Sequence, residues 1–410
     1  MKNAISLHRK AYGKNYKYLI LISLCLVAFI SVFCQYQMQP MAEKIKSIFH
    51  LTDSQYSALF TAPMTPAIFI SLICGIIVDK FGGRWPMFIS LLIGSIGLWG
   101  RVFATSYGML YICIFVVGFA ATFGNSSNAK MFSEWFTASE CSICIGIYMA
   151  SSSMGSAVAT ITTPHIATLK GAYTISAVVI TVVTIVWYIF YRDNATGDTS
   201  GASNIFNDSK EGFFTTIKII FKQKDMLLLC LGDMFLYGAH QSLSTFLVFV
   251  MASKGVDAAK TGMISAVTSA GMFAGNLILP QIVARLGNIK RPVVIFTLLG
   301  TCIFFLVAYI PAGILMILFL LLEGIFIGGS IPVLMAMPLN MSQIGSSRVG
   351  TAGGLIATFQ LLGSVVLPTY VVSRLAGGNY YHLVIISAVF SFIGVLLLAC
   401  LSKNVEVSQG

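Results

Sequence analysis

Residues 102–129 read VFATSYGMLYICIFVVGFAATFGNSSNA, and none of them is charged. The stretch Met87–Gly100 is also free of charge. A run of about 20 apolar residues is long enough to cross a bilayer as a helix. A helix satisfies its backbone hydrogen bonds internally, whereas a transmembrane β-barrel needs alternating polarity, which these runs lack. The sequence therefore predicts an all-α integral membrane protein.

Twelve such runs make up most of the 410 residues, of which 57 % are hydrophobic and only 10 % charged. Soluble domains carry roughly 25 % charged residues. The first run is expected to be a retained helix and not a cleaved signal peptide, because it is long and its polar tail extends to Lys17. The twelve predicted spans lie near residues 17–38, 55–78, 86–105, 108–130, 141–164, 171–191, 225–251, 261–284, 292–310, 312–338, 350–373 and 380–401.

The net charge of +11 is a signal of topology. With the N-terminus placed in the cytoplasm, the tail and the even-numbered loops hold 18 of the 25 Lys and Arg residues, and the other side holds 7. The positive-inside rule then places both termini in the cytoplasm. We expect a multi-pass protein of the plasma membrane (the inner membrane of a bacterial cell), with no nucleic-acid partner.

The chain repeats itself once around a polar segment, Asp193–Lys224, which is predicted to be a cytoplasmic linker. Gly82 recurs as Gly287, at an offset of 205 residues, and Gly155-Ser156 recurs as Gly363-Ser364, at an offset of 208. The offsets predict two pseudo-symmetric six-helix bundles, residues 1–192 and 225–410, around a central cavity near mid-membrane.

A short basic loop joins the second and third predicted spans: Gly75-Ile-Ile-Val-Asp79-Lys80-Phe81-Gly82-Gly83-Arg84. It resembles the G-x-x-x-D-[RK]-x-G-x-[RK] signature of the major facilitator superfamily. Gly75 allows close helix approach, Gly82 permits a tight turn, and Lys80 and Arg84 hold the loop in the cytoplasm. The resemblance implies the twelve-helix major facilitator fold and transport by alternating access. It also implies a gating role for Gly75, Asp79, Lys80, Gly82 and Arg84.

A second loop, Glu134-Trp135-Phe136-Thr-Ala-Ser-Glu140-Cys141, is similar to the W-F-P-x-x-E-R stretch of anion and organic-acid porters. It departs from that pattern at Thr137 and Cys141. Drug antiporters are disfavoured, because the fifth span lacks their G-P motif and Ile114 stands where many carry an arginine. The deep arginines of nitrate and sugar-phosphate porters, and the basic residue of an oxalate porter, are also missing from the corresponding spans.

Ionisable residues inside a membrane are costly, and each is a candidate functional residue. Asp233 begins a polar face at helical spacing in the seventh span, and Glu323 lies near the middle of the tenth. Both are candidates for proton coupling; the alternative for each is a satisfied structural residue. His240 can also take part in proton movement. The predicted solute-binding residues are Gln35, Asn125, Asn128, Tyr148, Asp233, Tyr237, His240, Gln241 and Gln360.

Three further features are expected to be structural. Arg101 is expected to extend to the membrane interface, although it could attract an anion from outside. Gln39 lies four residues after Gln35 and can bond a solute or another helix. The single C-x-x-C, Cys141–Cys144, lacks the second pair of a zinc site, so the cysteines are expected to be small packing residues.

The sequence thus predicts a secondary transporter for a small polar metabolite, an organic anion or a zwitterion, driven by a proton gradient or by exchange. It has no Walker-type loop for ATP. We expect no cofactor, no metal, no enzymatic activity and a monomer in the lipid bilayer, with the solute and protons as partners. A polytopic membrane enzyme and a transporter-derived solute sensor remain the alternatives; the enzyme would require clustered catalytic groups, for example Asp233 paired with Glu323.

Overall fold

The computed structural model describes residues 16–136, 138–192, 213–286, 289–341 and 349–402. For a few helical residues, among them Gly75, Asp79 and Lys80, it describes the backbone only. The described residues are helical, with turns and short connections and no strand. The described residues form two compact units: those within 1–37, 62–159 and 166–204 make up the first, and those within 38–61, 160–165 and 205–410 make up the second.

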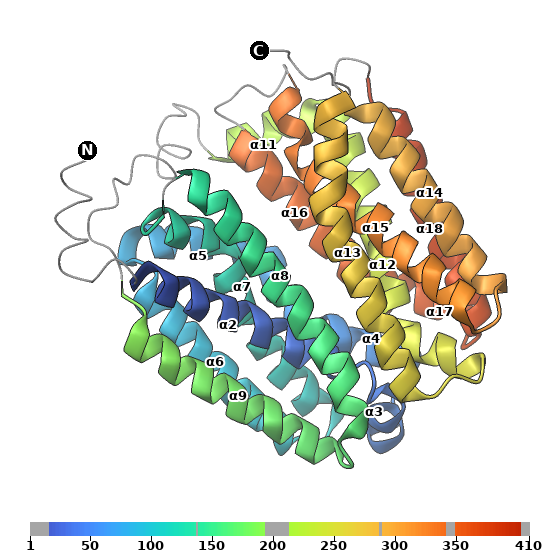
Figure 1. Ribbon diagram of the computed structural model, residues 1–410, viewed down its shortest axis with the longest axis horizontal. Coiled ribbons are helices and arrows are strands. Elements are labelled where there is room, and N and C mark those ends of the chain that lie inside the picture. Colours follow the sequence, from blue (N-terminus) through green and yellow to red (C-terminus); the bar gives the residue numbers. More distant parts are fainter. Residues whose placement is uncertain (1–15, 137, 193–212, 287–288, 342–348, 403–410) are drawn as a thin grey trace. The chain divides into compact units, whose positions relative to one another are not determined.

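Six long helices build the first unit (Figure 1). Helix α6 packs against α7 and α9, while α2 packs against α9 and α7, and α5 packs against α7. The bounds of these helices are α2 (Tyr16–Tyr36), α5 (Thr65–Phe81), α6 (Arg84–Val102), α7 (Tyr107–Ser133), α8 (Ala138–Thr162) and α9 (Leu169–Phe190).

The second unit has its own core around α12, and short helices from the first part of the chain join it. Within this unit, α13 packs against α15, α12 against α16 and α18, and α14 against α15 and α18. Its helices are α3 (Ala42–Phe49), α4 (Asp53–Thr61), α11 (Phe213–Lys222), α12 (Lys224–Ser253), α13 (Ala258–Leu286), α14 (Lys290–Tyr309), α15 (Ile314–Ala336), α16 (Val349–Val366), α17 (Ser373–Ala376) and α18 (Tyr380–Ala399).

The repeat seen in the sequence is confirmed by packing inside each unit. A Cβ on Gly155 would lie 2.3 Å from the carbonyl oxygen of Phe29, and a Cβ on Gly363 would lie 2.1 Å from that of Met234. Gly363 follows Gly155 by 208 residues, and Met234 follows Phe29 by 205. The first helix of each half therefore meets the fifth through the same glycine contact, which only a residue without a side chain allows.

Eleven helical segments of the described residues are long and apolar enough to cross a membrane. The remaining predicted span, the second, near 55–78, is present as α4, a 3₁₀ turn (Ala62–Met64) and α5. Pro63 lies within that turn and Pro66 at the start of α5, and proline provides no backbone N–H to continue a helix. The predicted spans are thus all found, with the second one interrupted.

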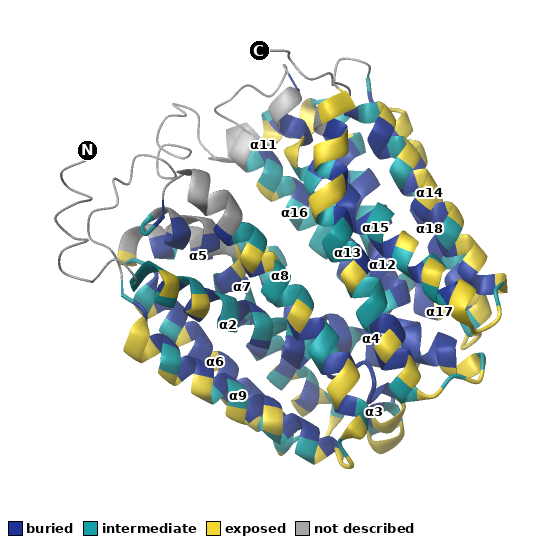
Figure 2. Ribbon diagram, in the orientation of Figure 1, coloured by how far each residue is buried: buried dark blue, intermediate teal, exposed yellow. Residues whose placement is uncertain are grey.

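Burial separates α12 from the other spans. In its most apolar stretch 78 % of the residues are buried, against 33–50 % in the other ten segments. Figure 2 shows exposed residues along the outer faces of α6, α9 and α14. Many of these are large and apolar, such as Ile96 and Ile295, which suits contact with lipid. A polar residue on α12 is consequently surrounded by protein.

Candidate functional site

The buried polar groups of the second unit centre on α12. Asp233, His240 and Gln241 are buried on this helix, and Tyr237 and Ser244 are half-buried. Among the buried residues that the structure describes, the acidic and basic side chains are Arg101, Asp233, His240 and Glu323. Three of these four ionisable residues belong to this one unit, on α12 and α15.

His240 and Glu323 form a buried pair. The Nδ1 atom of His240 lies 2.8 Å from Oε1 of Glu323, and the side chains are 7 % and 0 % exposed. The second carboxylate oxygen, Oε2, has no hydrogen-bond partner among the described residues. With His240 protonated and Glu323 ionised, the pair is neutral overall. A proton added to Glu323 would leave the histidine charge without its counter-ion.

Asp233 lies apart from this pair. Neither of its carboxylate oxygens has a hydrogen-bond partner in the described part of the chain, and the residue is 1 % exposed. The side-chain amide of Gln360, on α16, approaches the carboxylate without making a well-formed hydrogen bond. The suggested pairing of Asp233 with Glu323 is therefore not formed. Glu323 pairs with His240, which lies about two helical turns after Asp233 on α12.

A small cavity borders Asp233, enclosed by α12, α14 and α15. The space that the centre of a water-sized sphere can occupy is ≈ 10 Å³. That is about enough for one water molecule. An organic solute does not fit in this cavity.

The predicted site residues of the first unit form a separate group. The hydroxyl of Tyr148 on α8 donates to Oδ1 of Asn125 on α7 at 3.0 Å. Asn128 is buried one turn further along α7, beside the same hydroxyl. Gln35 is half-buried near the end of α2. The two asparagines and the tyrosine are thus brought together as one polar patch.

Arg101 does not extend to the interface, and that expectation was wrong. It is 2 % exposed, its Nη1 donates to the carbonyl of Cys34 at 3.1 Å, and its Nη2 donates to Oε1 of Gln37 at 3.0 Å. Its guanidinium also lies 4.1 Å from the centre of the Tyr173 ring. Cys34 is in the last turn of α2, where carbonyls lack intrahelical partners and the helix end carries partial negative charge. The arginine therefore caps that end of the helix.

Gln37, which was not among the residues predicted from the sequence, holds three groups of the first unit together. Its Oε1 accepts from Arg101 and from Ser176, and its Nε2 donates to the carbonyl of Ala172 at 2.8 Å. Two residues later, Gln39 donates to the Ser244 carbonyl and accepts from the Ser265 hydroxyl inside the second unit. Gln39 therefore forms hydrogen bonds to α12 and α13, as expected for a residue that bonds another helix.

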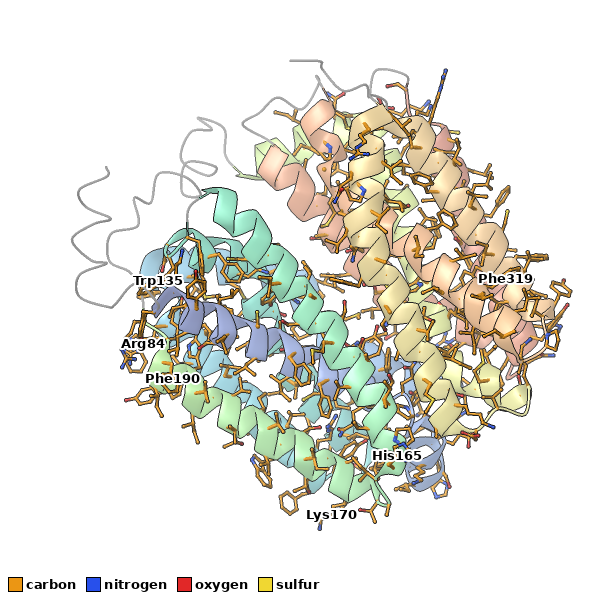
Figure 3. All side chains as sticks on the ribbon, viewed as in Figure 1. Arg84, Trp135, His165, Lys170, Phe190 and Phe319 are labelled. Carbon is orange, nitrogen blue, oxygen red and sulfur yellow. The ribbon has the colours of Figure 1, made fainter. Side chains whose placement is uncertain are left out.

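The signature loop is partly described. Gly82 ends α5 with φ = 77°, a conformation that glycine favours, and its N–H bonds the Val78 carbonyl. Arg84 donates to the Tyr188 carbonyl at 3.3 Å. The side chains of Asp79 and Lys80, and the surroundings of Gly75, lie outside the described residues. Figure 3 shows Arg84, Trp135 and Phe190 at one end of the first unit, with Lys170 at the other.

Lys46 and Asp257 lie outside the spans and have shifted pKa values. Burial alone would lower the pKa of Lys46, but the hydrogen bond and charge of Asp53 outweigh it, so the pKa lies above its ordinary value. The pKa of Asp257 is lowered, chiefly because the backbone N–H of Lys260 donates to its carboxylate. Both groups are thus held in their charged forms at neutral pH.

The remaining question about this site concerns metal-ligating side chains and cysteines. Among the described residues, no three His, Cys, Asp or Glu side chains lie in an arrangement that could hold a metal ion. Cys144 is buried in α8, while the side chain of Cys141 lies outside the described residues.

Comparison with known proteins gives the family. The model of the Major Facilitator Superfamily matches residues 24–368. The probable sulfoacetate transporter SauU of Cupriavidus necator is 23 % identical over 93 % of this chain and 92 % of its own. The nitrate/nitrite transporter NrtP of Nostoc punctiforme is 26 % identical over 34 % of this chain, a match that spans only 28 % of that relative.

Among solved structures, a bacterial homologue of the human lysosomal transporter Spinster, in an inward-facing and unoccupied conformation, matches with a TM-score of 0.77. The match covers 97 % of this chain and 100 % of that one at 15 % identity. At this identity the likeness establishes the fold alone.

Proposed function

The chain belongs to the major facilitator superfamily, and we propose that it is a proton-coupled secondary transporter of a small organic anion. Membership makes it a multi-pass transporter with two similar six-helix bundles. The proposal adds the solute class and the coupling ion. It is supported by relatives named for sulfoacetate and nitrate, both anions, and by the buried ionisable pair on α12 and α15.

The observation that carries the proposal is the pair His240–Glu323. An uncompensated charge buried in a membrane protein costs several kcal/mol, about 2.5–3.5 or more for one charged side chain. The pair avoids this cost while His240 is protonated and Glu323 is ionised. Imidazole is the side chain whose ordinary pKa lies nearest to neutrality, and Glu and His side chains form proton relays in membrane transporters. The pair is therefore suited to carry a coupling proton.

Charge balance then links the proton to the solute. A proton on Glu323 leaves His240 positively charged, and a carboxylate or sulfonate group of the solute can take the place of the lost counter-ion. The anion alone would compete with ionised Glu323, and the proton alone would leave a buried cation unpaired. Both half-loaded states are disfavoured, so proton and anion travel together.

The rest of the predicted site belongs to the same proposal. Tyr237 and Gln241 share the α12 face with His240 and would hydrogen-bond the solute, with Gln35, Asn125, Asn128, Tyr148 and Gln360 as further contacts. Arg101 is excluded, because its guanidinium already bonds Cys34 and Gln37. We further propose a monomer in the plasma membrane, with halves 1–192 and 225–410 that alternate access to the site.

The test is uptake into proteoliposomes with an imposed pH gradient, with labelled sulfoacetate and labelled acetate as anionic probes and glucose as a neutral one. We expect an anion, and not glucose, to accumulate when the interior is alkaline. Glu323→Gln should reduce this accumulation at least tenfold while anion exchange continues, because a permanently neutral side chain cannot release the proton. Glu43→Gln, an exposed carboxylate on α3, is the matched control.

Two results would contradict the proposal. One is Glu323→Gln protein that accumulates the anion as the wild type does. The other is saturable uptake of glucose without uptake of either anion, which would show that the solute is not an organic anion.

A further inference from the structure

An apolar groove lies between α5, α6 and α7 of the first unit. Its volume is ≈ 540 Å³, within the usual range for a site that holds a small organic molecule. Ser90 of its lining donates its hydroxyl to the Met87 carbonyl at 2.8 Å, so the walls present mainly carbon to an occupant. A hydrocarbon chain suits such a lining, and a polar solute does not. The walls include Ile77 and Phe81 from α5, Trp85 and Ile89 from α6, and Phe119 and Phe123 from α7.

The groove opens to the lipid. Phe81, Trp85 and Ile89 are 61 %, 50 % and 53 % exposed. Apolar side chains exposed along a membrane helix face hydrocarbon tails. An acyl chain that enters the groove is therefore held between three helices, while the chains around it stay in the bulk lipid.

Two arginines lie side by side at one end of the groove. Nη2 of Arg84 donates to the Tyr188 carbonyl at 3.3 Å, and Nη1 of Arg192 donates to the same carbonyl at 3.1 Å. The Arg84 guanidinium also lies 5.3 Å from the centre of the Trp85 ring, which lines the groove. Two like charges this close repel each other, so an anion beside both lowers the electrostatic energy. Through Trp85 this positive site is continuous with the apolar groove.

Aromatic side chains around the arginines mark the level of the lipid headgroups. The Trp85 ring meets the Tyr188 ring edge-on, with centroids 6.2 Å apart, and Tyr188 and Phe190 are 46 % and 40 % exposed. Arg84 and Phe190 lie at the same end of the first unit (Figure 3). Exposed Trp and Tyr residues concentrate where the membrane meets water, at the depth of the headgroups. The arginine pair is thus at a suitable depth for a lipid phosphate.

We propose that this surface binds one anionic phospholipid, with an acyl chain in the groove and the phosphate beside Arg84 and Arg192. A zwitterionic lipid fits less well, because its headgroup brings a cation close to two guanidinium groups. Inorganic phosphate also fits less well, since it leaves the groove empty. Basic pockets between membrane helices bind anionic headgroups in this way. The surface belongs to the first unit, whereas the His240–Glu323 pair belongs to the second.

Lipid binding is measured by native mass spectrometry on the purified, delipidated full chain in detergent, without solute or a gradient. Phosphatidylglycerol and phosphatidylcholine with the same acyl chains are titrated separately, and inorganic phosphate is added as a competitor. We expect one phosphatidylglycerol per chain to bind at least tenfold more tightly than phosphatidylcholine, because both arginines attract its net negative charge. Inorganic phosphate at the same concentration should not displace it.

Variants of the arginines test the headgroup site. Arg84→Gln combined with Arg192→Gln should weaken the binding of phosphatidylglycerol at least tenfold and leave that of phosphatidylcholine unchanged. Arg192→Gln alone should weaken it severalfold, and this variant serves if the double variant fails to fold. Lys170→Gln, which removes an exposed cation at the other end of the same unit, is the control and should bind as the wild type does.

Variants of α6 test the groove. Ile89→Trp places a larger side chain in the groove and should weaken the binding of both lipids severalfold. Ile96→Trp is the matched control, because Ile96 lies about two turns further along the same helix, is 71 % exposed and is outside the described lining of the groove. It should bind both lipids as the wild type does.

The proposal is overturned if the two lipids bind the wild type with equal affinity, or if inorganic phosphate displaces phosphatidylglycerol. It is equally overturned if the double arginine variant keeps the wild-type affinity, or if Ile89→Trp and Ile96→Trp bind phosphatidylglycerol alike. The measurements use neither solute nor a proton gradient, so their outcome does not depend on whether Glu323 carries a coupling proton.

Discussion

Polar residues within the spans differ in how well they are bonded. Gln37 is bonded at both ends of its amide, and Arg101 through both terminal nitrogens. Asp233 and one oxygen of Glu323 have no hydrogen-bond partner among the described residues. A buried polar group without a hydrogen-bond partner costs about 1–3 kcal/mol, so each such group calls for a physical explanation. We assign Gln37 and Arg101 a structural role, whereas Glu323 carries the proposed proton coupling.

Arg101 offers a test of the structural assignment. Arg101→Met should lower the free energy of unfolding by about 1–3 kcal/mol, because it leaves the Cys34 carbonyl at the end of α2 without a partner. The measurement is denaturant or thermal unfolding in detergent. Lys170→Met, an exposed cation at the start of α9, is the control and should change stability by less than about 0.5 kcal/mol. Equal effects of the two substitutions would contradict the capping role.

The residue types of the site could be predicted from sequence, but their pairing could not. Asp233, His240 and Glu323 stand out because ionisable residues are rare in apolar runs. That Glu323 meets His240 depends on how α12 and α15 pack, 83 residues apart in the chain. The position of Arg101 was predicted wrongly for the same reason, since its partners Cys34 and Gln37 lie at the end of α2 and in the turn after it.

At the scale of helices, the glycine contacts decide how closely spans approach. Gly363→Ala would place a Cβ 2.1 Å from the Met234 carbonyl oxygen, so α16 must move away from α12. We expect a loss of about 1–3 kcal/mol in the free energy of unfolding, although alanine favours a helix over glycine by about 1 kcal/mol. Thermal unfolding of the purified variant measures it.

Gly354→Ala is the matched control on the same helix. A Cβ there meets nothing within 4 Å, so the helix propensity acts alone and stability should stay the same or rise. A loss of stability in Gly363→Ala together with no loss in Gly354→Ala would support the contact between Gly363 and the Met234 carbonyl. A stabilising Gly363→Ala would contradict it.

The spans themselves were predictable because lipid leaves helices as the option for long apolar runs. The interruptions were not. Pro63 and Pro66 divide the second span, and Leu367–Val372 form a π-helical turn that contains Pro368. Proline is tolerated inside a transmembrane helix when neighbouring groups bond the freed backbone, so its presence in an apolar run does not reveal where a helix breaks.

For the whole molecule, the repeat shows that the two halves differ at the positions of His240 and Glu323. Met234 matches Phe29 at an offset of 205 residues, and the same offset places Gln35 where His240 stands. A Cβ on Gly118 would meet the Pro63 carbonyl, and a Cβ on Gly324 would meet the Thr268 carbonyl in the same way. Gly324 follows Gly118 by 206 residues, and Thr268 follows Pro63 by 205. This register places Val117 where Glu323 stands. The second half therefore holds an ionisable pair that the first half lacks.

Orientation in the membrane is the remaining prediction at this scale. The tail and even-numbered loops hold 18 of 25 Lys and Arg residues, so both termini should be cytoplasmic. In the first unit, Arg84 and Lys170 lie at opposite ends, as loops on opposite sides of a membrane must (Figure 3). A green fluorescent protein fused after Gly410 should therefore fluoresce in a bacterial host, and alkaline phosphatase fused there should be inactive.

The internal control is alkaline phosphatase fused after Lys170, which should be active because that loop faces away from the cytoplasm. The reverse pattern at the two fusion points would contradict the topology. It would also reverse the direction in which a proton gradient drives the carrier, since the His240–Glu323 pair would then load from the other side. Orientation and coupling must therefore be measured on the same protein before a direction of transport is assigned.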